Sequence, residues 1–276
     1  MALGSSPVET DLIKALSRII GIVLVKNEDR FLRQAVMNAS AFCDHWIFAD
    51  NGSDDATPDI LADLAGSLPS SEVHVSCNPA ESHRLLEHFA GSDTWIFGLD
   101  GDEIYDASGL KNMRCRLLSG EFSHSWMVLG NVVHVTTLDT ENMAAFGHAS
   151  PPSRSMTKLY NFGAINSWGG YCPERLHGGT PSFRRGYSSV HRTALHENTV
   201  WEEADFRCLH VCFLRRSSRD ASGTVRPNLM DIQGGTRFSR LPKRIAAFLG
   251  WAKNAKWKDE RYRRGPLVRV STEGFF

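Results

Sequence analysis

The feature that most constrains the fold is the alternation of short apolar runs with helix-like stretches between residues 19 and 106. Ile19–Val25 is apolar and rich in β-branched residues, which is typical of a strand buried on both faces. Further strand-like runs follow at 45–49, 73–76 and 94–99. Stretches with helical spacing precede each of them, at 28–42, 57–68 and 81–90. Strands and helices that alternate in this way predict βαβ units and a mainly parallel sheet.

The composition is that of an ordinary globular protein. A chain of 276 residues with 42% apolar and 22% charged residues is not globally disordered, and it fits one large domain or two small ones. The balance of 31 Lys and Arg against 31 Asp and Glu argues against a uniformly cationic protein that coats nucleic acid. Six scattered cysteines suit the reduced thiols of a cytoplasmic protein, and no apolar run approaches the roughly 20 residues of a membrane span.

Acidic side chains follow the strand-like run at 94–99 directly, as Asp100-Gly101-Asp102-Glu103. In open α/β sheets the ligand crevice lies beyond the carboxyl ends of the strands. Two carboxylates one residue apart can share Mg²⁺ or Mn²⁺ and leave coordination positions open for phosphate oxygens. Such a metal offsets the charge of a leaving diphosphate. A lone Asp-x-Asp pair is also common in solvated turns, so the motif needs support from its neighbours.

The first two strands end in polar clusters as well. Val25-Lys26-Asn27-Glu28 closes the first, and Asp50-Asn51-Gly52-Ser53-Asp54-Asp55 closes the second. An Asp at such a strand end can accept a hydrogen bond from the imino group of a base, and a Gly lets the backbone approach the ligand closely. Three successive polar strand ends indicate one shared crevice.

In this order, the segments VKNE, DNGSDDAT and WIFGLDGDE resemble the nucleotide-sugar half of the family 2 glycosyltransferases with the GT-A fold, over roughly residues 19–106. The resemblance implies an α/β fold with a Rossmann-like, mainly parallel central sheet flanked by helices, a smaller mixed sheet on the acceptor side and a C-terminal helical segment. We expect a single GT-A domain over residues 1–276. Its parts would be a nucleotide-sugar-binding half (19–106), an acceptor-binding half (107–222) and a basic C-terminal helical segment (223–276).

The resemblance also implies roles for individual residues. Asp50 would contact the base, Asp100 and Asp102 would serve the metal and the diphosphate, and Arg84 would contact a phosphate. The family often carries two acidic residues where this chain has Asp50-Asn51. The remaining residues expected around the nucleotide sugar are Val25, Lys26, Asn27, Glu28, Asn51, Gly52 and Gly101.

A histidine near the end of the catalytic domain completes the metal shell in many GT-A enzymes, and a basic loop beside it closes over the diphosphate. His210 fits that pattern, followed by Arg215, Arg216 and Arg219 as bidentate phosphate clamps. The alternative is a strand with a buried histidine and a solvated arginine pair. A zinc site of Cys208, His210 and Cys212 is possible in geometry, because alternate strand residues share a face, but it lacks a fourth ligand.

The second half must supply the acceptor site and a general base. An inverting transfer needs a carboxylate that deprotonates the acceptor hydroxyl. Glu174 is the first choice, because it lies in the Gly-rich stretch 168–179 and because a segment like 158–162 precedes such a loop in the resembling family. Trp168, Tyr171 and His177 of the same stretch would stack on and hydrogen-bond the acceptor. Glu197, Glu202 and Glu203 are rival bases, and Glu174 could instead pair with an arginine.

The C-terminal part is basic, with ten Lys and Arg residues between Arg240 and Arg269. The spacing of its apolar residues predicts an amphipathic helix over 242–258. Such a helix could pack on the sheet, steer an anionic acceptor or lie on an anionic membrane face, which would make the protein peripheral to a membrane.

These observations predict a glycosyltransferase, of the hexosyltransferase or a related class, that depends on Mn²⁺ or Mg²⁺ and transfers a sugar from a nucleoside-diphosphate sugar to an acceptor hydroxyl by inversion. The family makes UDP the expected nucleotide. One alternative is a sugar-phosphate nucleotidyltransferase, although the Gly-rich opening loop of those enzymes is replaced here by Val25-Lys26-Asn27-Glu28. The other is a non-catalytic module that binds glycans or nucleic acid. The acceptor could be a glycan, a small metabolite, a protein or a nucleic acid.

Overall fold

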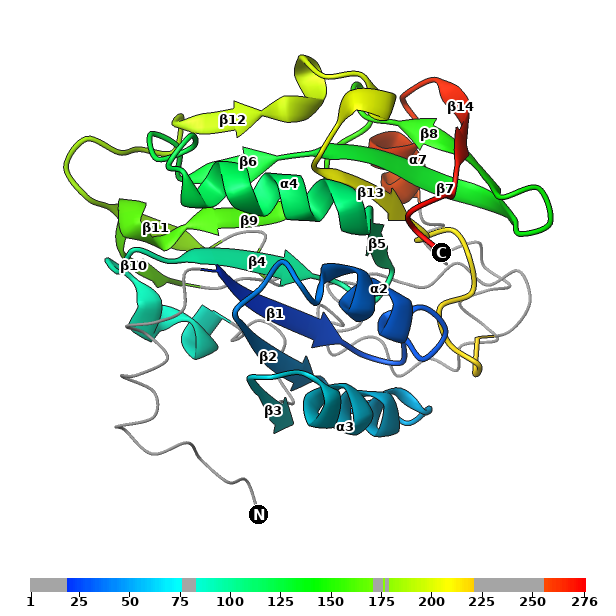
Figure 1. The fold of residues 1–276 in the computed structure, drawn as a ribbon, viewed down its shortest axis with the longest axis horizontal. Helices are drawn as coiled ribbons and strands as arrows, with labels where there is room; N and C mark the ends of the chain where they lie inside the picture. The colour runs from blue at the N-terminus through cyan, green and yellow to red at the C-terminus, as the bar shows by residue number, and fades with distance from the viewer. Residues whose placement is uncertain (1–18, 76–82, 171–175, 177–178, 221–255) are drawn as a thin grey trace, which may run out of the picture.

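Two β-sheets, with helices packed on the first of them, make up most of the chain in the computed structural model (Figure 1). The structure describes residues 19–75, 83–170, 176, 179–220 and 256–276. Residues 1–18 lie outside the described residues. So do most of the predicted helix 242–258 and the candidate residues Tyr171, Glu174 and His177.

The first sheet begins with four parallel strands, in the order β3-β2-β1-β4. Their bounds are β1 Ile19–Val25, β2 His45–Asp50, β3 Ser71–Val75 and β4 Trp95–Leu99, and the helices between them are α2 Leu32–Ala39 and α3 Thr57–Ser67. All seven residues of β1 are buried, because β1 pairs with β2 on one side and with β4 on the other. The predicted alternation of strands and helices around a parallel sheet is confirmed.

Three strands from later in the chain extend this sheet beyond β4, in the order β9-β6-β12. Their bounds are β6 Met127–Leu129, β9 Lys158–Asn161 and β12 Arg192–Ala194. β9 runs antiparallel to β4 and places Lys158 opposite Gly98. Side chains from the second half of the chain therefore lie beside the carboxyl end of β4.

The second sheet is mixed and has the order β14-β8-β7-β13-β5 among the described residues. Its strands are β5 Glu103–Tyr105, β7 Asn131–Asp139, β8 Ala144–Ala149, β13 Arg207–His210 and β14 Leu267–Ser271. His210 on β13 is level with Glu103 on one side and with His134 on the other. This is the smaller mixed sheet that the sequence predicts.

The other elements are helices α4 and α7, a hairpin and short 3₁₀ helices. Their bounds are α4 Ala107–Leu118, α7 Lys256–Tyr262, β10 Ile165–Gly169, β11 Thr180–Phe183, η2 Glu87–Phe89, η3 Phe162–Ala164, η4 Leu195–Glu197 and η5 Trp201–Glu203. In Figure 1, α2 and α4 lie over the near face of the first sheet.

Two layers of the core pack on the first sheet, one on each face, and a further cluster of buried residues packs at the second sheet. Val23 and Val25 of β1 point into the layer that includes α2, α3 and α4, where Leu61 of α3 is buried. The alternate residues Ile22 and Leu24 point into the opposite layer, together with Phe89, Tyr160 and Trp168 among others. Burial of both faces explains why the strand-like runs of the sequence are continuously apolar rather than alternating.

Several elements differ from their predicted extents. Helix α2 begins at Leu32 rather than near residue 28, because residues 27 and 28 are held by hydrogen bonds to the loop after β2. In the described part of the predicted helix 81–90, residues 83–85 and η2 each form a 3₁₀ turn in place of an α-helix. The sequence predicts a helical C-terminal segment, and α7 is a helix in it. The chain then continues into the strand β14, which was not predicted.

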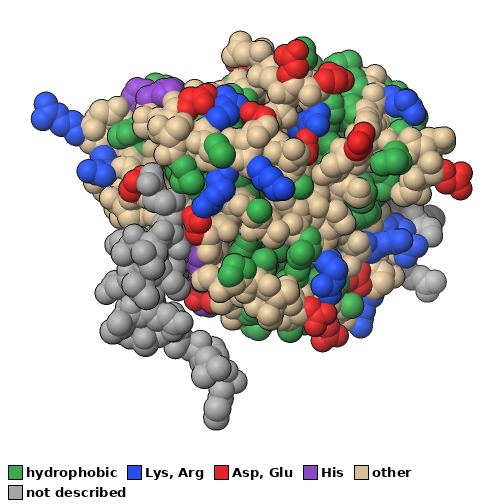
Figure 2. Space-filling view, viewed as in Figure 1, with side chains coloured by type: hydrophobic (Ala, Val, Ile, Leu, Met, Phe, Trp, Pro, Cys, Tyr) green, Lys and Arg blue, Asp and Glu red, His purple; other side chains and the backbone are tan. Residues whose placement is uncertain are grey.

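On the face in Figure 2, acidic and basic side chains are interspersed with apolar ones, which agrees with the balanced charge of the sequence. The search for a membrane-spanning helix, made over the described residues, found none of sufficient length and hydropathy.

Candidate functional site

The loops after β1 and β2 are locked together at the carboxyl end of the first sheet. The Asn27 amide donates to Asp54 Oδ1 (2.7 Å) and accepts from the Asp54 backbone N–H (2.8 Å). The Asn27 backbone N–H donates to Ser53 Oγ (2.8 Å), and that of Glu28 donates to Thr57 Oγ1 (2.8 Å). Asn27 has a φ of +55°, a conformation that Asn adopts more readily than most residues. The polar clusters that end the first two strands thus form one rigid rim.

Asp50 and Asn51 lie side by side at this rim. Asp50 accepts hydrogen bonds from the Ser53 backbone N–H (3.0 Å) and from Ser53 Oγ (2.6 Å), which fixes its carboxylate. Asn51 is only 5% exposed, and neither its Oδ1 nor its Nδ2 has a hydrogen-bond partner among the described residues. A buried amide without partners costs about 1–3 kcal/mol. A ligand that offers both a donor and an acceptor, as the edge of a nucleobase does, would remove that cost.

Asp100, at the end of β4, belongs to a buried charge cluster with Glu103 and Lys158. Lys158 Nζ lies 2.6 Å from Glu103 Oε1 and 3.2 Å from Asp100 Oδ2, and its side chain is fully buried. Burial raises the pKa of Glu103 to about 7, although Lys158 pulls it down. Burial acts to lower the pKa of Lys158, but the two carboxylates raise it above its ordinary value. Lys158 therefore carries its positive charge inside the protein.

Asp102 belongs to a second cluster, with Arg216, Glu28 and His210. Arg216 Nη1 lies 2.5 Å from Asp102 Oδ2 and 3.4 Å from Glu28 Oε1, and His210 Nε2 lies 3.6 Å from Asp102 Oδ2. Burial opposes ionisation of Asp102, but Arg216 and His210 hold its pKa well below the ordinary value. Gly101 is required between the two aspartates, because a Cβ there would lie 2.5 Å from Glu28 Oε2.

His210 is held in turn by His134 of β7. His134 Nε2 lies 2.9 Å from the Arg154 carbonyl oxygen, and its Nδ1 lies 2.9 Å from His210 Nδ1. A carbonyl oxygen only accepts, so His134 Nε2 carries a proton, and burial keeps the ring neutral by lowering its pKa well below the ordinary value. His210 Nδ1 must then donate to His134. This leaves His210 Nε2 directed at Asp102.

Cys212 lies close to both histidines. One ligand atom each from His134, His210 and Cys212 come within 4.8 Å of one another, and all three residues are buried. Burial acts to lower the pKa of His210, but Cys212 and Asp102 raise it to about 10. The zinc site considered from the sequence consisted of Cys208, His210 and Cys212. In the structure, His134 takes the place of Cys208 in this group.

Asp100, Asp102 and His210 have the kinds of donor that a divalent metal accepts. Among the described residues, however, the metal-ligand atoms that lie within 4.8 Å of one another are those of His134, His210 and Cys212, so the two aspartates and His210 do not surround a common ion position. The raised pKa of His210 also leaves its Nε2 protonated, and His210 would have to lose that proton to bind a metal. The negative charge of the two aspartates is already matched by Lys158 and Arg216. A bound metal would therefore have to displace or share one of these protein cations.

The loop after β13 reaches across to the first half of the chain. Arg216 points inward to Asp102 and Glu28, whereas Arg215 is exposed and donates to the Ser218 carbonyl oxygen (3.4 Å). Arg219 pairs with Asp54 at 2.8 Å in an exposed position. Further bonds across this junction join Ser217 Oγ to Asp55 Oδ2 (2.5 Å) and the Ser218 backbone N–H to Asp29 Oδ1 (2.7 Å). The structure thus places the predicted basic loop against the crevice, with Arg216 bound to carboxylates.

The other candidates are scattered around the crevice. Val25 and Gly101 are buried, and Lys26 and Gly52 are exposed. Arg84 is exposed on the segment that leads into η2. Trp168 is 2% exposed, and its ring centre lies 4.9 Å from that of Tyr160. It is therefore part of the core. The rival bases Glu197, Glu202 and Glu203 are exposed on η4 and η5.

Three residues of these clusters were missed as site residues in the sequence: Glu103, His134 and Lys158. Lys158 is a lone charge in the otherwise uncharged stretch MTKLYNF, and His134 interrupts the apolar run NVVHV. A single polar residue in an apolar strand was the available signal, because such a residue must find a partner inside the fold.

Comparison with solved structures finds chains that share part of this architecture. S. aureus TarS 1–349 matches over 52% of this chain and 47% of its own, with 14% identity and a TM-score of 0.36. A second structure of TarS 1–349, in complex with UDP, has 15% identity and a TM-score of 0.34. Glucosyl-3-phosphoglycerate synthase from Mycobacterium tuberculosis, in complex with Mn²⁺, UDP and glucosyl-3-phosphoglycerate, matches over 49% of each chain, with 20% identity and a TM-score of 0.30. No protein-family profile and no curated protein matches the sequence. The chain spans about half the length of these solved chains.

Proposed function

We propose that the protein is a glycosyltransferase that moves a sugar from a nucleoside-diphosphate sugar to an acceptor hydroxyl, with inversion and with Mn²⁺ or Mg²⁺. The observation that supports this best is the convergence of polar side chains at one edge of the first sheet. Three strand ends bring a buried amide without partners, Asn51, to the same sheet edge as two carboxylates, Asp100 and Asp102. The first suits a base and the second pair suits a metal-bound diphosphate. The resemblance to family 2 glycosyltransferases makes UDP the expected nucleotide.

In this proposal the base binds at Asp50 and Asn51, and Val25–Glu28, Gly52 and Gly101 line the nucleotide-sugar pocket. Asp100, Asp102 and His210 would hold the metal, which when bound offsets the charge on the departing diphosphate. Lys158 and Arg216 keep the buried carboxylates ordered, because they balance their charge. Arg84 and Arg215, both exposed, would contact phosphate oxygens.

Transfer forms a bond from the acceptor oxygen to the anomeric carbon and breaks the bond from that carbon to the diphosphate. The acceptor proton passes to a carboxylate. We assign this role to Glu174, with Trp168, Tyr171 and His177 on the acceptor side and Glu197, Glu202 and Glu203 as alternatives. In support, Leu176 and Trp168, which lie on either side of Glu174 in the chain, are buried in the layer that also holds Tyr160.

The chemistry suits the cytoplasm, where thiols stay reduced. In support, Cys43, Cys115, Cys208 and Cys212 are free thiols among the described residues. If the basic C-terminal segment binds an anionic membrane, the protein would work at its surface.

Calorimetric titration of UDP, GDP and dTDP, each with and without Mn²⁺, tests the donor site. The wild type is expected to bind one of the three in a metal-dependent way, and Asp102→Asn is expected to weaken that binding at least about 10-fold, because a charged ligand oxygen is lost. Asp63→Asn is the matched control, since Asp63 is exposed and pairs with Arg33 on the helical face. If a folded wild-type protein binds none of the nucleotides, the donor-site proposal is wrong and a binding module becomes the better reading.

A further inference from the structure

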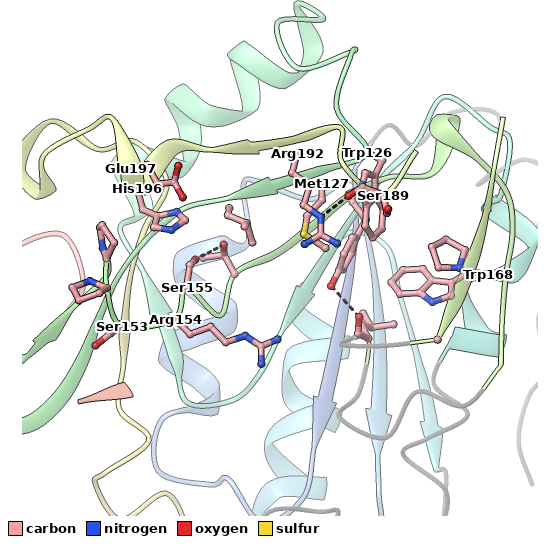
Figure 3. A pocket seen from close by; sticks show the side chains of 18 residues that line it. Trp126, Met127, Ser153, Arg154, Ser155, Trp168, Ser189, Arg192, His196 and Glu197 are labelled. Atoms are coloured by element: carbon pink, nitrogen blue, oxygen red, sulfur yellow. Dashed lines mark hydrogen bonds between the residues drawn. The ribbon is translucent and has the colours of Figure 1, made fainter. Parts of the chain in front are cut away.

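A cavity of about 720 Å³ lies against the first sheet, on the face away from α2, α3 and α4 (Figure 3). Trp126, Tyr160 and Trp168 form one wall. The opposite side is formed by η4 and by the residues that follow β8. The cavity is large enough for a ligand of sugar size, and it is lined by aromatic groups with a few polar ones, as small-molecule sites commonly are.

The cavity adjoins the candidate donor site. Tyr160, which lines it, shares a face of β9 with Lys158, because alternate residues of a strand point to the same side. Lys158 Nζ lies 3.2 Å from Asp100 Oδ2. Leu176, which also lines the cavity, would be 3.0 Å from a Cβ on Gly98, two residues before Asp100. A molecule in the cavity would thus lie next to the carboxyl end of β4, where the sugar donor is proposed to bind.

Two arginines give the cavity its charge. Arg154 and Arg192 are exposed, and neither pairs with a carboxylate among the described residues, unlike Arg116, Arg207 and Arg216. In Figure 3 the Arg154 side chain extends into the open middle of the cavity. Against these two guanidinium groups the described lining residues offer one carboxylate, that of Glu197.

Arg192 is anchored through its guanidinium, and Arg154 is anchored through its backbone. Arg192 Nε donates to the Ser189 carbonyl oxygen (2.8 Å), and its guanidinium lies 5.5 Å from the centre of the Trp126 ring. The Arg154 backbone N–H donates to the Arg261 carbonyl oxygen (2.9 Å), and its own carbonyl oxygen accepts from His134. Guanidinium groups recognise phosphate or carboxylate groups through paired hydrogen bonds.

The cavity lining also includes the ring of His196. Its Nδ1 is buried and has no hydrogen-bond partner among the described residues. Burial lowers the pKa of His196, so the ring is neutral. Neutral imidazole, the aromatic wall and two guanidinium groups together suit a polyol or sugar that also bears an anionic group.

We infer that this cavity binds the acceptor, and that the acceptor carries a phosphate or a carboxylate beside its hydroxyl-bearing part. The word acceptor rests on the proposed function, whereas the preference for an anion rests on the cavity alone.

Tryptophan fluorescence provides the test, because Trp126 and Trp168 line the cavity. The probes are inorganic phosphate, glucose 6-phosphate, glucuronate and glucose. We expect saturable binding of the anionic probes, and binding of glucose at least about 10-fold weaker. Arg154→Gln and Arg192→Gln should each weaken anion binding about 10-fold, since one charge-assisted contact corresponds to about that factor. Arg185→Gln is the matched control, because Arg185 is exposed and does not line the cavity. Circular dichroism checks that each variant folds.

The arms separate the possible anions and the two proposals. Binding of glucose 6-phosphate alone would identify a phosphate acceptor, and binding of glucuronate alone a carboxylate acceptor. Sugar-phosphate binding in a protein that binds no nucleotide would sustain the anion site and overturn the donor site. Equal binding of glucose and glucose 6-phosphate, no binding of any anionic probe, or unchanged binding by both arginine variants would overturn the inference.

Discussion

Every carboxylate in the two buried clusters at the candidate site has a cation within reach. Lys158 serves Asp100 and Glu103, and Arg216 serves Asp102 and Glu28. A buried charge without a partner is costly, so each cation favours the ionised form of the carboxylates beside it. The aspartates are thus ordered by the protein itself before any ligand binds.

Lys158→Met tests this dependence. The variant would leave Asp100 and Glu103 buried without their cation, and breaking such a cluster destabilises a protein by roughly 3–5 kcal/mol. Urea unfolding measures the loss. Glu103→Gln in the same background should recover part of it, because the Glu103 charge is then removed as well. A Lys158→Met protein as stable as the wild type would contradict the role of Lys158.

The same cluster sets a pH dependence. The pKa of Glu103 in the folded protein, about 7, lies above its ordinary value of 4.5, so the folded state holds more protons than the unfolded state between these values. Stability contributed by this group therefore falls as the pH rises from 4.5 to 7. Because Lys158 lowers the pKa of Glu103, removal of Lys158 should extend the fall to higher pH in the unfolding series.

The sequence predicted the site residues that belong to continuous motifs and missed those that come from elsewhere. Asp100 and Asp102 follow a strand, and Asn51 lies in a turn cluster, so each can be found from local pattern. Lys158 and His134 reach the site only because β9 pairs with β4 and β7 pairs with β13. Strand pairing between distant segments is set by tertiary packing, and the local pattern does not show it.

At the scale of elements, the buried strands were predictable and the exposed edges were not. The strand β1 is buried throughout and reads as a continuous apolar run. The strand β14 is half exposed, and its sequence LVRVS follows a basic stretch with helical spacing. It forms a strand because β8 offers a free edge over Ala144–Ala149. Tertiary context here overrides a weak local preference.

The edge strand β3 carries a carboxylate that lies close to two histidines, and these contacts depend on pH. Glu72 Oε2 lies 3.3 Å from His74 Nε2, and Glu72 Oε1 lies 3.9 Å from His45 Nε2 on β2. The two nearby histidines lower the pKa of Glu72 to about 2, and the Glu72 carboxylate raises the pKa of His74. The Glu72 contribution is present above pH 4.5 and is lost as the pH falls towards 2. The His74 contribution is present below pH 6.5 and is lost as the pH rises above its shifted pKa.

Hydrogen exchange of the β3 amides should therefore be slowest between about pH 4.5 and 6.5, after correction for the intrinsic exchange rate. Glu72→Gln should flatten that profile by removing the carboxylate that both histidines approach. The pairs are partly exposed, so the expected effect is at most about 1 kcal/mol. A profile unchanged by Glu72→Gln would show that strand pairing alone holds the edge.

At the scale of the whole molecule, the two halves defined from the sequence are interlocked. The first sheet takes β6, β9 and β12 from the second half, and the second sheet takes β5 from the first. The loop at 215–220 adds hydrogen bonds to Asp29, Asp54 and Asp55. A boundary near residue 106 thus does not separate two cores.

This interlocking predicts that a fragment ending at residue 106 does not fold alone. It would leave β4 without β9 and β5 without β13, and would expose the buried charges of Asp100 and Glu103 that Lys158 neutralises. The full chain should unfold in one cooperative transition, with far-UV circular dichroism and tryptophan fluorescence giving the same midpoint in urea. Far-UV circular dichroism reports on the backbone of the whole chain. Tryptophan fluorescence reports on both halves, because Trp46 and Trp95 lie in the parallel strands whereas Trp126 and Trp168 line the cavity. Two separate transitions, or a cooperatively folded 1–106 fragment, would mean that the nucleotide-sugar half is an independent domain, and the single-domain proposal would then be wrong.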